Sequence, residues 1–326
     1  MKKIVVDIYG ADAGAAVVVR GVAKAMQTDP IFPVLVGDET IIRDIMDEHH
    51  IPDTAYEVIH TEDYITNDEP ATCVFGGRDT SSAVLALERL KKDDDCVAML
   101  SAGNTGALLV GSICRLGLVP PIKFPSLCSA LPCAGEQLVC LVDCGAAIDC
   151  TANDLVRFAK MGQVFSQCYC GIETPRVGLM SVGREDAKGS ALTLEAFQKI
   201  RELDLCFVGN LEGSDLVSGY ADVVVTDGFS GNLLLKSTEA AGQKAMEIAL
   251  GLCGDQPALA DAIREALIQR FDFNSRGAAT FLGTKKTVVK MHGCANEDTT
   301  VASIRQILRL EGSGFSQKIA QALIGG

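Results

Sequence analysis

The chain has 326 residues, of which 48% are hydrophobic and only 5% aromatic, with no tryptophan. A core of this composition must be built from Ala, Val, Leu and Ile, which suits parallel strands buried between helices. The formal net charge of −13 argues against nucleic acid as a partner, because phosphate backbones are bound by clustered Lys and Arg. No signal peptide is recognised and no apolar run approaches the ~20 residues of a membrane span, so we expect a cytoplasmic protein.

Strands and helices alternate along the first part of the chain. Apolar runs predict strands at 3–8, 33–36, 56–59 and 96–100, and helical periodicity covers 13–26, 39–47, 81–92 and 107–115. Residues 60–80 are polar and mixed, which predicts a long surface loop near an active site. The stretch 117–136 is rich in Pro and Gly and predicts the crossover into a second lobe.

The second part of the chain repeats this alternation. Strands are predicted at 137–142, 176–182, 205–208, 222–226 and 287–291, and helices at 154–168 (capped by Asn153), 191–201, 233–251, 257–270 and twice after residue 293. The helices within about 233–270 form an antiparallel hairpin. The whole pattern predicts an α/β fold, a three-layer, mostly parallel sheet with helices on both faces. We expect residues 1–326 to form a single α/β unit of two intimately joined lobes.

The thirteen cysteines form no CxxC pair, and only four histidines could complete a zinc site. Most cysteines, such as Cys96, Cys140 and Cys206, lie within apolar runs. We therefore expect them to be small core side chains in a reducing cell. The sequence predicts neither a metal site nor a cofactor.

The loop after residues 96–100 carries the clearest ligand signal. It joins a strand end to a helix N-terminus, where unpaired N–H groups and the helix dipole attract anions. Gly103 and Gly106 allow a ligand to approach the backbone closely, and side-chain donors are available from Ser101, Asn104 and Thr105. These features predict a phosphate site. The alternative is a tight turn capped by Thr105.

Four other strands end in small polar loops, namely Asp143-Cys-Gly-Ala146, Gly183-Arg-Glu-Asp-Ala-Lys-Gly189, Asp227-Gly-Phe-Ser-Gly-Asn232 and His292-Gly293. Strand C-terminal ends line one edge of a parallel sheet, so we expect all five loops to converge on one cleft. The substrate-binding residues expected from these loops are Asp143, Glu185, Asp227, Gly228, Ser230, Gly231 and Asn232. No serine-histidine-acid arrangement with a nucleophile elbow is present, which favours direct attack over a covalent acyl-enzyme.

Two loop residues are the best candidates for catalysis. The ammonium of Lys188 suits phosphate, and the alternative is an ion pair with Glu185 or Asp186. His292 directly follows a strand and is a candidate acid, base or donor; the alternative is a structural histidine. Asn232 is predicted to open a helix and so to mark a second anion-binding N-terminus, with a plain N-cap as the alternative.

These motifs, together with Pro175-Arg-Val-Gly-Leu179, resemble in order the PlsX family of phosphate acyltransferases, from Val5 to about Arg305. The resemblance implies transfer of a fatty acyl group from acyl carrier protein to inorganic phosphate, which gives acyl phosphate for phospholipid synthesis. It also implies a fold related to phosphate acetyltransferases and isocitrate dehydrogenases, and a homodimer. In that family the hairpin is associated with dimer contacts and peripheral membrane attachment.

Several positions depart from the family pattern. The first loop usually reads Asp-x-x-Gly-Gly-Asp-His-Ala-Pro, and here Ala13 and Ala15 replace its histidine and proline. Only Arg78 remains of a basic run, and Ala147 stands where the family has asparagine. Fewer cations leave open a divergent member with another acyl donor, or one with reduced activity.

The leading hypothesis is attack of a phosphate oxygen on an acyl thioester, carried by acyl carrier protein or coenzyme A, with oriented donors stabilising the oxyanion. One alternative is a short-chain phosphate acetyl- or butyryltransferase, or the acetyl-phosphate-forming subunit of a reductase complex. The other is a degenerate, non-catalytic paralogue acting as a binding subunit.

The hairpin predicts an oligomer. Its first helix has wide apolar coverage, including Leu233, Leu234 and Leu235, and its second helix is amphipathic. A monomer would expose a large apolar patch, so we expect a two-fold dimer interface, with a hairpin packed only on its own chain as the alternative. The turn at 252–257 lacks Lys and Arg, which predicts weak or absent membrane contact.

Overall fold

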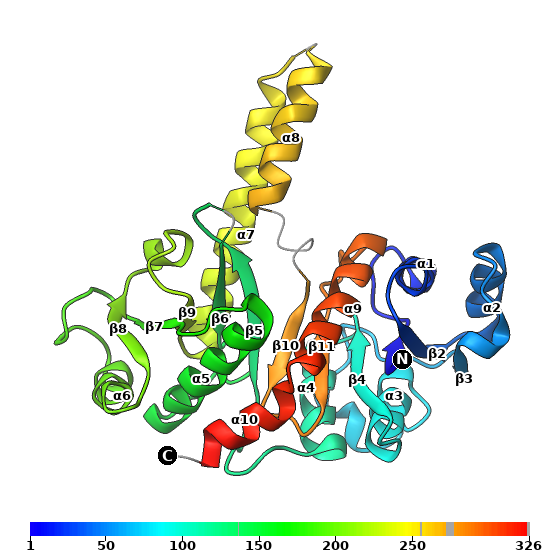
Figure 1. Cartoon of the computed structure of the whole chain (residues 1–326), viewed down its shortest axis with the longest axis horizontal. Helices are drawn as coiled ribbons and strands as arrows, with labels where there is room; N and C mark the ends of the chain where they lie inside the picture. The colour runs from blue at the N-terminus through cyan, green and yellow to red at the C-terminus, as the bar shows by residue number, and fades with distance from the viewer. Residues whose placement is uncertain (136, 255, 272–276, 325–326) are drawn as a thin grey trace. The chain divides into compact units, whose positions relative to one another are not determined.

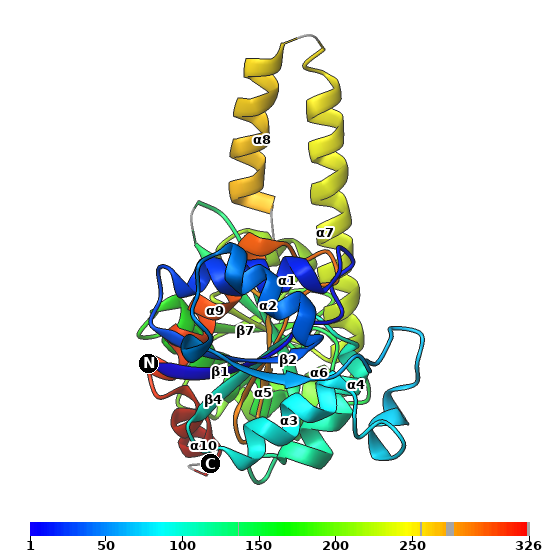
Figure 2. The same cartoon turned by 90° about the vertical axis from the view of Figure 1, so that its right-hand side faces the viewer.

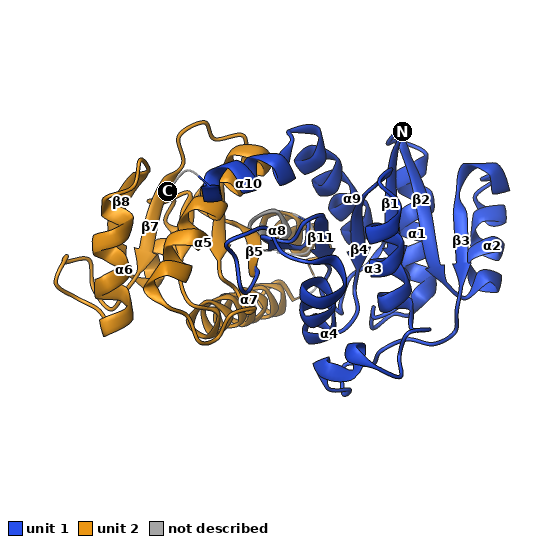
Figure 3. Ribbon diagram, turned by 90° about the horizontal axis from the view of Figure 1, so that it is seen from below, with its two compact units in different colours: residues 1–125, 277–326 blue, residues 126–276 orange. Residues whose placement is uncertain are grey.

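The computed structural model describes residues 1–135, 137–254, 256–271 and 277–324, without the side chains of 267–271. The chain divides into two compact units, described separately below. Unit 1 combines Met1–Pro125 with Gly277–Gly326, and unit 2 is the intervening segment Ser126–Arg276 (Figure 3).

Unit 1 is a largely parallel sheet with helices on both faces. Its strands are β1 (Lys2–Asp7), β2 (Ile31–Gly37), β3 (Glu57–His60), β4 (Cys96–Ser101), β10 (Ala279–Leu282) and β11 (Thr287–Lys290). They lie in the order β3-β2-β1-β4-β11-β10, and only β10 is antiparallel to its neighbour β11. Its α-helices are α1 (Ala15–Met26), α2 (Glu39–Glu48), α3 (Ser82–Lys92), α4 (Thr105–Gly111), α9 (Glu297–Gly312) and α10 (Phe315–Ile324). Figure 1 shows these elements.

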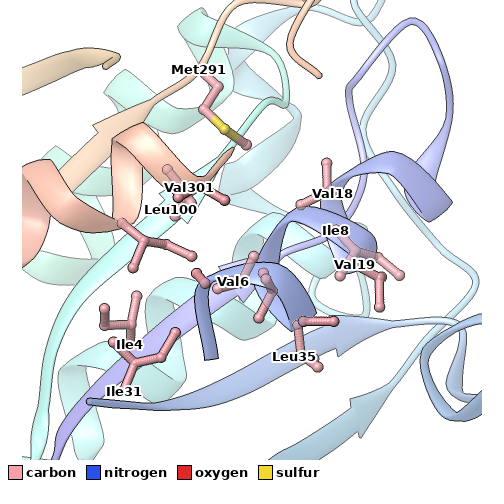
Figure 4. Close-up of a cluster of buried hydrophobic side chains, with 14 of the residues drawn as sticks. Ile4, Val6, Ile8, Val18, Val19, Ile31, Leu35, Leu100, Met291 and Val301 are labelled. Carbon is pink, nitrogen blue, oxygen red and sulfur yellow. The ribbon is translucent and has the colours of Figure 1, made fainter. Parts of the chain in front are cut away.

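The core of unit 1 explains its layering. Alternate residues of β1, including Ile4 and Val6, meet Val19 of α1 and Val301 of α9 in one fully or nearly buried cluster (Figure 4). The opposite face of these strands is covered by α3, so the sheet is apolar on both sides (Figure 2). Continuous apolar strands are what a sheet buried on both faces requires.

Unit 2 is built in the same way. Its strands are β5 (Ser126–Pro132), β6 (Leu138–Val142), β7 (Arg176–Met180), β8 (Cys206–Leu211) and β9 (Val223–Val225), in the order β5-β6-β9-β7-β8. All pairs are parallel except β5 with β6. Helices α5 (Ala152–Phe165) and α6 (Ala191–Arg201) pack together against these strands. The predicted α/β class with a mostly parallel sheet is confirmed.

Most predicted elements are confirmed within a few residues, and three details are wrong. Residues 126–132 and 279–282 form β5 and β10, for which the sequence analysis predicted no strand. Asn153 does not cap α5; Thr151 does, through a reciprocal capping box with Asp154. Cys206 is exposed, whereas Cys96 and Cys140 are buried as expected.

The helical hairpin belongs to unit 2. It consists of α7 (Gly228–Gly251) and α8 (Pro257–Phe271), which pack against each other and extend away from the strands of unit 2 (Figures 1 and 2). Only four residues of α7 are buried, and among its larger side chains Leu233 and Ile248 are 60% and 55% exposed. The side chains of Leu267, Ile268 and Arg270, also predicted for the hairpin, lie outside the described residues. Within the described part, no helix combines the length and apolarity needed to cross a membrane.

Candidate functional site

Three neighbouring strands of unit 1 end side by side at one edge of the sheet. Asp7 of β1 pairs in register with Ser101 of β4, and Ser101 pairs with Lys290 of β11. The hydroxyl of Ser101 donates to Asp7 Oδ2 over 2.8 Å and accepts from the Gly103 N–H over 2.9 Å. Both side chains are fully buried or nearly so. The Ser101 hydroxyl is therefore occupied by the protein and shapes the loop rather than facing it.

Asn104, and not Thr105, caps α4. Its Oδ1 accepts from the Ala107 N–H over 3.0 Å. Its Nδ2 donates to main-chain carbonyls in the loop after β3, at 3.0 Å from Thr66, 3.3 Å from Asn67 and 3.2 Å from Glu69. One side chain thus closes the start of the helix and fastens the long 60–80 loop beside it.

The amides at the start of α4 are available to a ligand. In the described parts of the chain, the N–H groups of Thr105 and Gly106 have no hydrogen-bond partner, as expected for the first turn of a helix. Thr105 and Gly106 are both partly exposed. These two amides retain the anion-binding chemistry that the sequence predicted for this loop.

The loop leaving β1 presses directly on the Ser101–Gly106 loop. A Cβ on Gly10, whose φ is +98°, would lie 2.4 Å from the Gly103 Cα. A glycine is therefore required at position 10. Beside it, Tyr9 stacks on Tyr64 with ring centroids 4.6 Å apart. Together with Asp12 and Asn67 these residues line a cavity of about 330 Å³.

The turn holding His292 lies at the same edge of unit 1. It follows β11, and the carbonyl of Gly293 accepts from the Asp12 N–H over 2.7 Å, next to the β1 loop. The carbonyl of His292 accepts from the Ala295 N–H over 3.1 Å. The structure therefore brings the His292 turn to the same edge as the β1 and Ser101–Gly106 loops, as expected for ends of neighbouring parallel strands.

In unit 2 the carboxylate of Asp143 organises its own loop. It is fully buried and accepts from four main-chain N–H groups, those of Leu127, Gly145, Ala146 and Ala147, over 2.6–3.2 Å. Burial raises the pKa of this carboxyl, and the N–H groups oppose that rise. Since both oxygens serve the backbone, Asp143 acts on any substrate only through the shape of its loop.

The helix after β9 begins earlier than expected. Asp227 is its N-cap, with Oδ1 accepting from the Ser230 N–H over 2.8 Å, so the prediction that Asn232 opens the helix is wrong. A carboxylate already occupies that N-terminus, which disfavours a second anion there. Asn232 is exposed one turn further on, near Gly145.

Two glycines bring this helix against the Asp143 loop. The Gly228 N–H donates to the Ala147 carbonyl over 2.8 Å. A Cβ on Gly231 would lie 1.9 Å from the Asp143 carbonyl oxygen, so only glycine fits. Gly228 and Gly231 therefore serve the close packing of two loops at the C-terminal edge of unit 2.

Lys188 is an exposed cation in the loop after β7. In the described residues it forms no ion pair, and Asp186 lies instead 3.8 Å from Arg201. Buried Asn210 holds the loop by donating to the carbonyls of Glu185 and Lys188, over 2.9 and 3.3 Å. The alternative of an ion pair between Lys188 and Glu185 or Asp186 is thus not found, and the ammonium is free to meet an anion.

Each unit therefore gathers its own candidate residues at the C-terminal ends of its strands. The further expectation that the loops of both lobes meet in one cleft stays a prediction. Residues that the sequence analysis did not select include Asp7, Asn210 and Lys290. A lysine ending the apolar strand 287–291 was a usable signal, because a charge at such a position must find partners.

The thirteen cysteines are all free thiols. Among the described residues, no three His, Cys, Asp or Glu side chains are grouped so that they could hold a metal ion. Burial raises the pKa of Cys144 and Cys150 to about 12, so these thiols stay protonated at neutral pH.

Comparisons with known proteins agree with this architecture. Residues 2–318 match a family described as "Fatty acid synthesis protein". The phosphate acyltransferase of Thermoanaerobacterium thermosaccharolyticum is 35% identical over 311 residues, covering 93% of this chain and 91% of that protein. The phosphate acyltransferase of Clostridioides difficile is 31% identical over 326 residues, covering 98% and 95%.

Solved structures show the same fold at low identity. A phosphotransacetylase from Streptococcus pyogenes covers 99% of this chain and 95% of its own, with a TM-score of 0.65 and 16% identity. A branched-chain phosphotransacylase from Enterococcus faecalis covers 95% and 98%, with a TM-score of 0.58 and 17% identity. From the family match and the curated relatives, the chain belongs to the fatty acid synthesis protein family, the PlsX phosphate acyltransferases, and is an acyltransferase with phosphate as acceptor.

Proposed function

We propose that this protein transfers a fatty acyl group from an acyl thioester, first of all acyl carrier protein, to inorganic phosphate. The product is an acyl phosphate that serves phospholipid synthesis. The observation that carries the proposal is the near full-length identity to proteins named phosphate acyltransferase. The free N–H groups of Thr105 and Gly106 support it, because they suit a phosphate group.

The proposed reaction is a direct displacement. A phosphate oxygen attacks the thioester carbonyl carbon and forms a tetrahedral oxyanion. The carbonyl re-forms as the C–S bond breaks, and the thiolate leaves and takes up a proton. Donors aimed at the developing oxyanion contribute on the order of 3–4 kcal/mol each, and holding both substrates in line supplies much of the rest.

Each candidate residue receives a specific role. Thr105 and Gly106 bind phosphate through their amides, and Ser101 fixes the loop that presents them. Lys188 supplies a mobile positive charge for phosphate, as an ammonium without an ion pair in the described residues. His292 is the donor to the oxyanion or to the leaving sulfur.

The test is phosphate-dependent release of thiol from purified protein. Acyl carrier protein and coenzyme A thioesters of two to eighteen carbons are offered with and without phosphate, and free thiol and acyl phosphate are measured. We expect release only with phosphate, fastest with long-chain acyl carrier protein. Preference for acetyl or butyryl donors would favour a short-chain transferase. No release from any donor would overturn the proposal and favour a non-catalytic paralogue.

Lys188→Met tests the proposed cation. We expect the Michaelis constant for phosphate to rise about tenfold, the equivalent of ~1.4 kcal/mol. Lys199→Met is the matched control, because Lys199 is partly exposed in the same unit and pairs with Glu195 over 2.7 Å. An unchanged phosphate dependence in Lys188→Met would remove Lys188 from the site.

We further propose that the hairpin of α7 and α8 forms a two-fold contact with a second copy of the chain. The exposed side chains of Leu233 and Ile248 support this, since apolar surface of this kind favours burial in an interface. The turn between the helices lacks Lys and Arg, so we expect weak or no binding to anionic liposomes. Light scattering that finds a monomer at micromolar concentration would contradict the dimer, and firm co-flotation with liposomes would contradict the membrane expectation.

A further inference from the structure

A lysine stands in the strand-end row of unit 1 without a role in the chemistry described so far. Asp7, Ser101 and Lys290 are the last residues of β1, β4 and β11, in register across three adjacent parallel strands. Side chains at paired positions of parallel strands project to the same face of the sheet. The row therefore carries a carboxylate, a hydroxyl and an ammonium next to one another.

The ammonium of Lys290 is almost completely removed from solvent, since the residue is only 8% exposed. Its Nζ donates to the carbonyl of Ala102 over 3.1 Å and to the carbonyl of Met291. Ala102 lies within the loop that follows Ser101, and Met291 directly precedes His292. One side chain therefore fastens two of the loops that carry the candidate phosphate and donor groups.

The charge of Lys290 also answers that of Asp7. An isolated ionised group in a protein interior is costly, and removing one partner of a buried pair leaves the other uncompensated. Burial raises the pKa of the Asp7 carboxyl, while the Ser101 hydroxyl and the positive charge of Lys290 oppose this rise. Without the lysine, an ionised Asp7 would face an incoming phosphate with an unbalanced negative charge.

The other end of β11 provides a natural comparison. Lys286, directly before that strand, donates from its Nζ to the carbonyls of Leu90, Asp93 and Cys96, over 2.8, 2.9 and 3.2 Å. It also holds main-chain segments together, but at the N-terminal edge of the sheet. Lys286 thus matches Lys290 in chemistry and differs from it in place.

We propose that Lys290 is a positioning residue for phosphate, holding the Ser101–Gly106 loop and the His292 turn in place while balancing the charge of Asp7. The proposal rests on the proposed transfer to phosphate and assigns to Lys290 no contact with the reacting atoms. Its specific consequence is that loss of Lys290 weakens phosphate binding beyond any effect on folding.

The experiment compares Lys290→Met, Lys286→Met and the double variant Asp7→Asn/Lys290→Met with the wild type. Thiol release gives kcat and separate Michaelis constants for phosphate and thioester, and thermal unfolding is followed with and without inorganic phosphate. For Lys290→Met we expect at least a tenfold higher Michaelis constant for phosphate, with that for thioester changed less than twofold. For Lys286→Met we expect a lower unfolding temperature with both constants within twofold of wild type.

The double variant separates positioning from charge balance, and it also serves if Lys290→Met does not fold. We expect it to recover much of the unfolding temperature but to keep the raised phosphate constant. Recovery of both would overturn the proposal, as would a phosphate constant within twofold of wild type in Lys290→Met. If the wild type releases no thiol, the proposed function fails, and the rise in unfolding temperature on adding phosphate still tests Lys290: an equal rise in wild type and double variant, or none in either, overturns it.

Discussion

Each unit buries one aspartate at the C-terminal end of a strand, and the two are held in opposite ways. Asp143 in unit 2 is surrounded by four main-chain N–H groups, which belong to its own loop and to the neighbouring strand β5. Asp7 in unit 1 is bonded to the Ser101 hydroxyl and the Tyr9 N–H and lies in the field of Lys290.

The difference separates a structural carboxylate from one that is part of a functional arrangement. Backbone donors cannot be exchanged by substitution, so the Asp143 loop has one conformation and depends on a single side chain. Side-chain partners can be changed one at a time, so the Asp7 row can be adjusted to a ligand. Perturbed carboxyl groups are therefore better judged by their partners than by their burial alone.

The largest effect should follow Asp143→Ala. It leaves four buried N–H groups without an acceptor, which we expect to lower the free energy of unfolding by about 4 kcal/mol, given ~1–3 kcal/mol for each unsatisfied group. Asp7→Ala should cost about half as much, since Ser101 can rotate to another acceptor. Denaturant unfolding of both variants measures this. Equal losses would contradict the distinction between the two aspartates.

Gly10→Ala tests how tightly the Asp7 edge is packed. Its Cβ would lie 2.4 Å from the Gly103 Cα, so we expect a loss of about 3 kcal/mol from overpacking and strain, together with a higher phosphate constant. Gly14→Ala is the control: its φ of +88° is also positive, but a Cβ there meets nothing within 4 Å. We expect only about 1 kcal/mol from backbone strain alone. Similar losses in the two variants would contradict crowding at position 10.

Helix caps compare the same two edges more gently. Asn104→Ala and Asp227→Ala each remove an N-cap, and each should cost about 1 kcal/mol. Only Asn104 also holds the carbonyls of Thr66, Asn67 and Glu69, so only Asn104→Ala should speed proteolysis within 60–80. Limited proteolysis followed by mass spectrometry locates the cuts, and faster cutting there in both variants would contradict the tether.

The smallest effect is in the pH dependence of stability. Because burial raises the pKa of Asp7 in the folded chain, its protonated form contributes stability below the unfolded value of about 3.9, and this contribution is lost as pH rises through the folded pKa. Asp7→Asn abolishes this titration. The unfolding free energy of the variant minus that of the wild type should therefore increase from pH 4 to pH 7. A constant difference over this range would contradict the raised pKa.

Much of the fold could be predicted from the sequence, because apolar runs and helical spacing are local signals. Helix α6 was predicted at its observed bounds, 191–201. The strands β5 and β10 were missed since both lie in stretches with Pro or Gly and pair antiparallel to β6 and β11, a relation that local periodicity does not reveal.

The candidate loops were also found from the sequence, but the duties of their side chains were not. Ser101 and Asp143 have the residue types of ligand-binding groups, yet both are buried and bonded within the protein. Which of several polar residues faces a ligand depends on neighbours distant in the sequence, such as Asp7 for Ser101. Lys290 was overlooked for the same reason, since its partners are main-chain carbonyls that carry no residue signature.

The division of the chain has a consequence for its synthesis. Unit 2 is an insertion between residues 125 and 277 of unit 1, and the partner that β4 needs on its open side, β11, lies about 190 residues later. A nascent chain can complete unit 2 while unit 1 is still a partial sheet with an unpaired edge, which is prone to wrong association. The Asp7–Ser101–Lys290 row is then assembled only when translation is almost finished, so a ribosome stalled before residue 287 would release a chain in which that row cannot form.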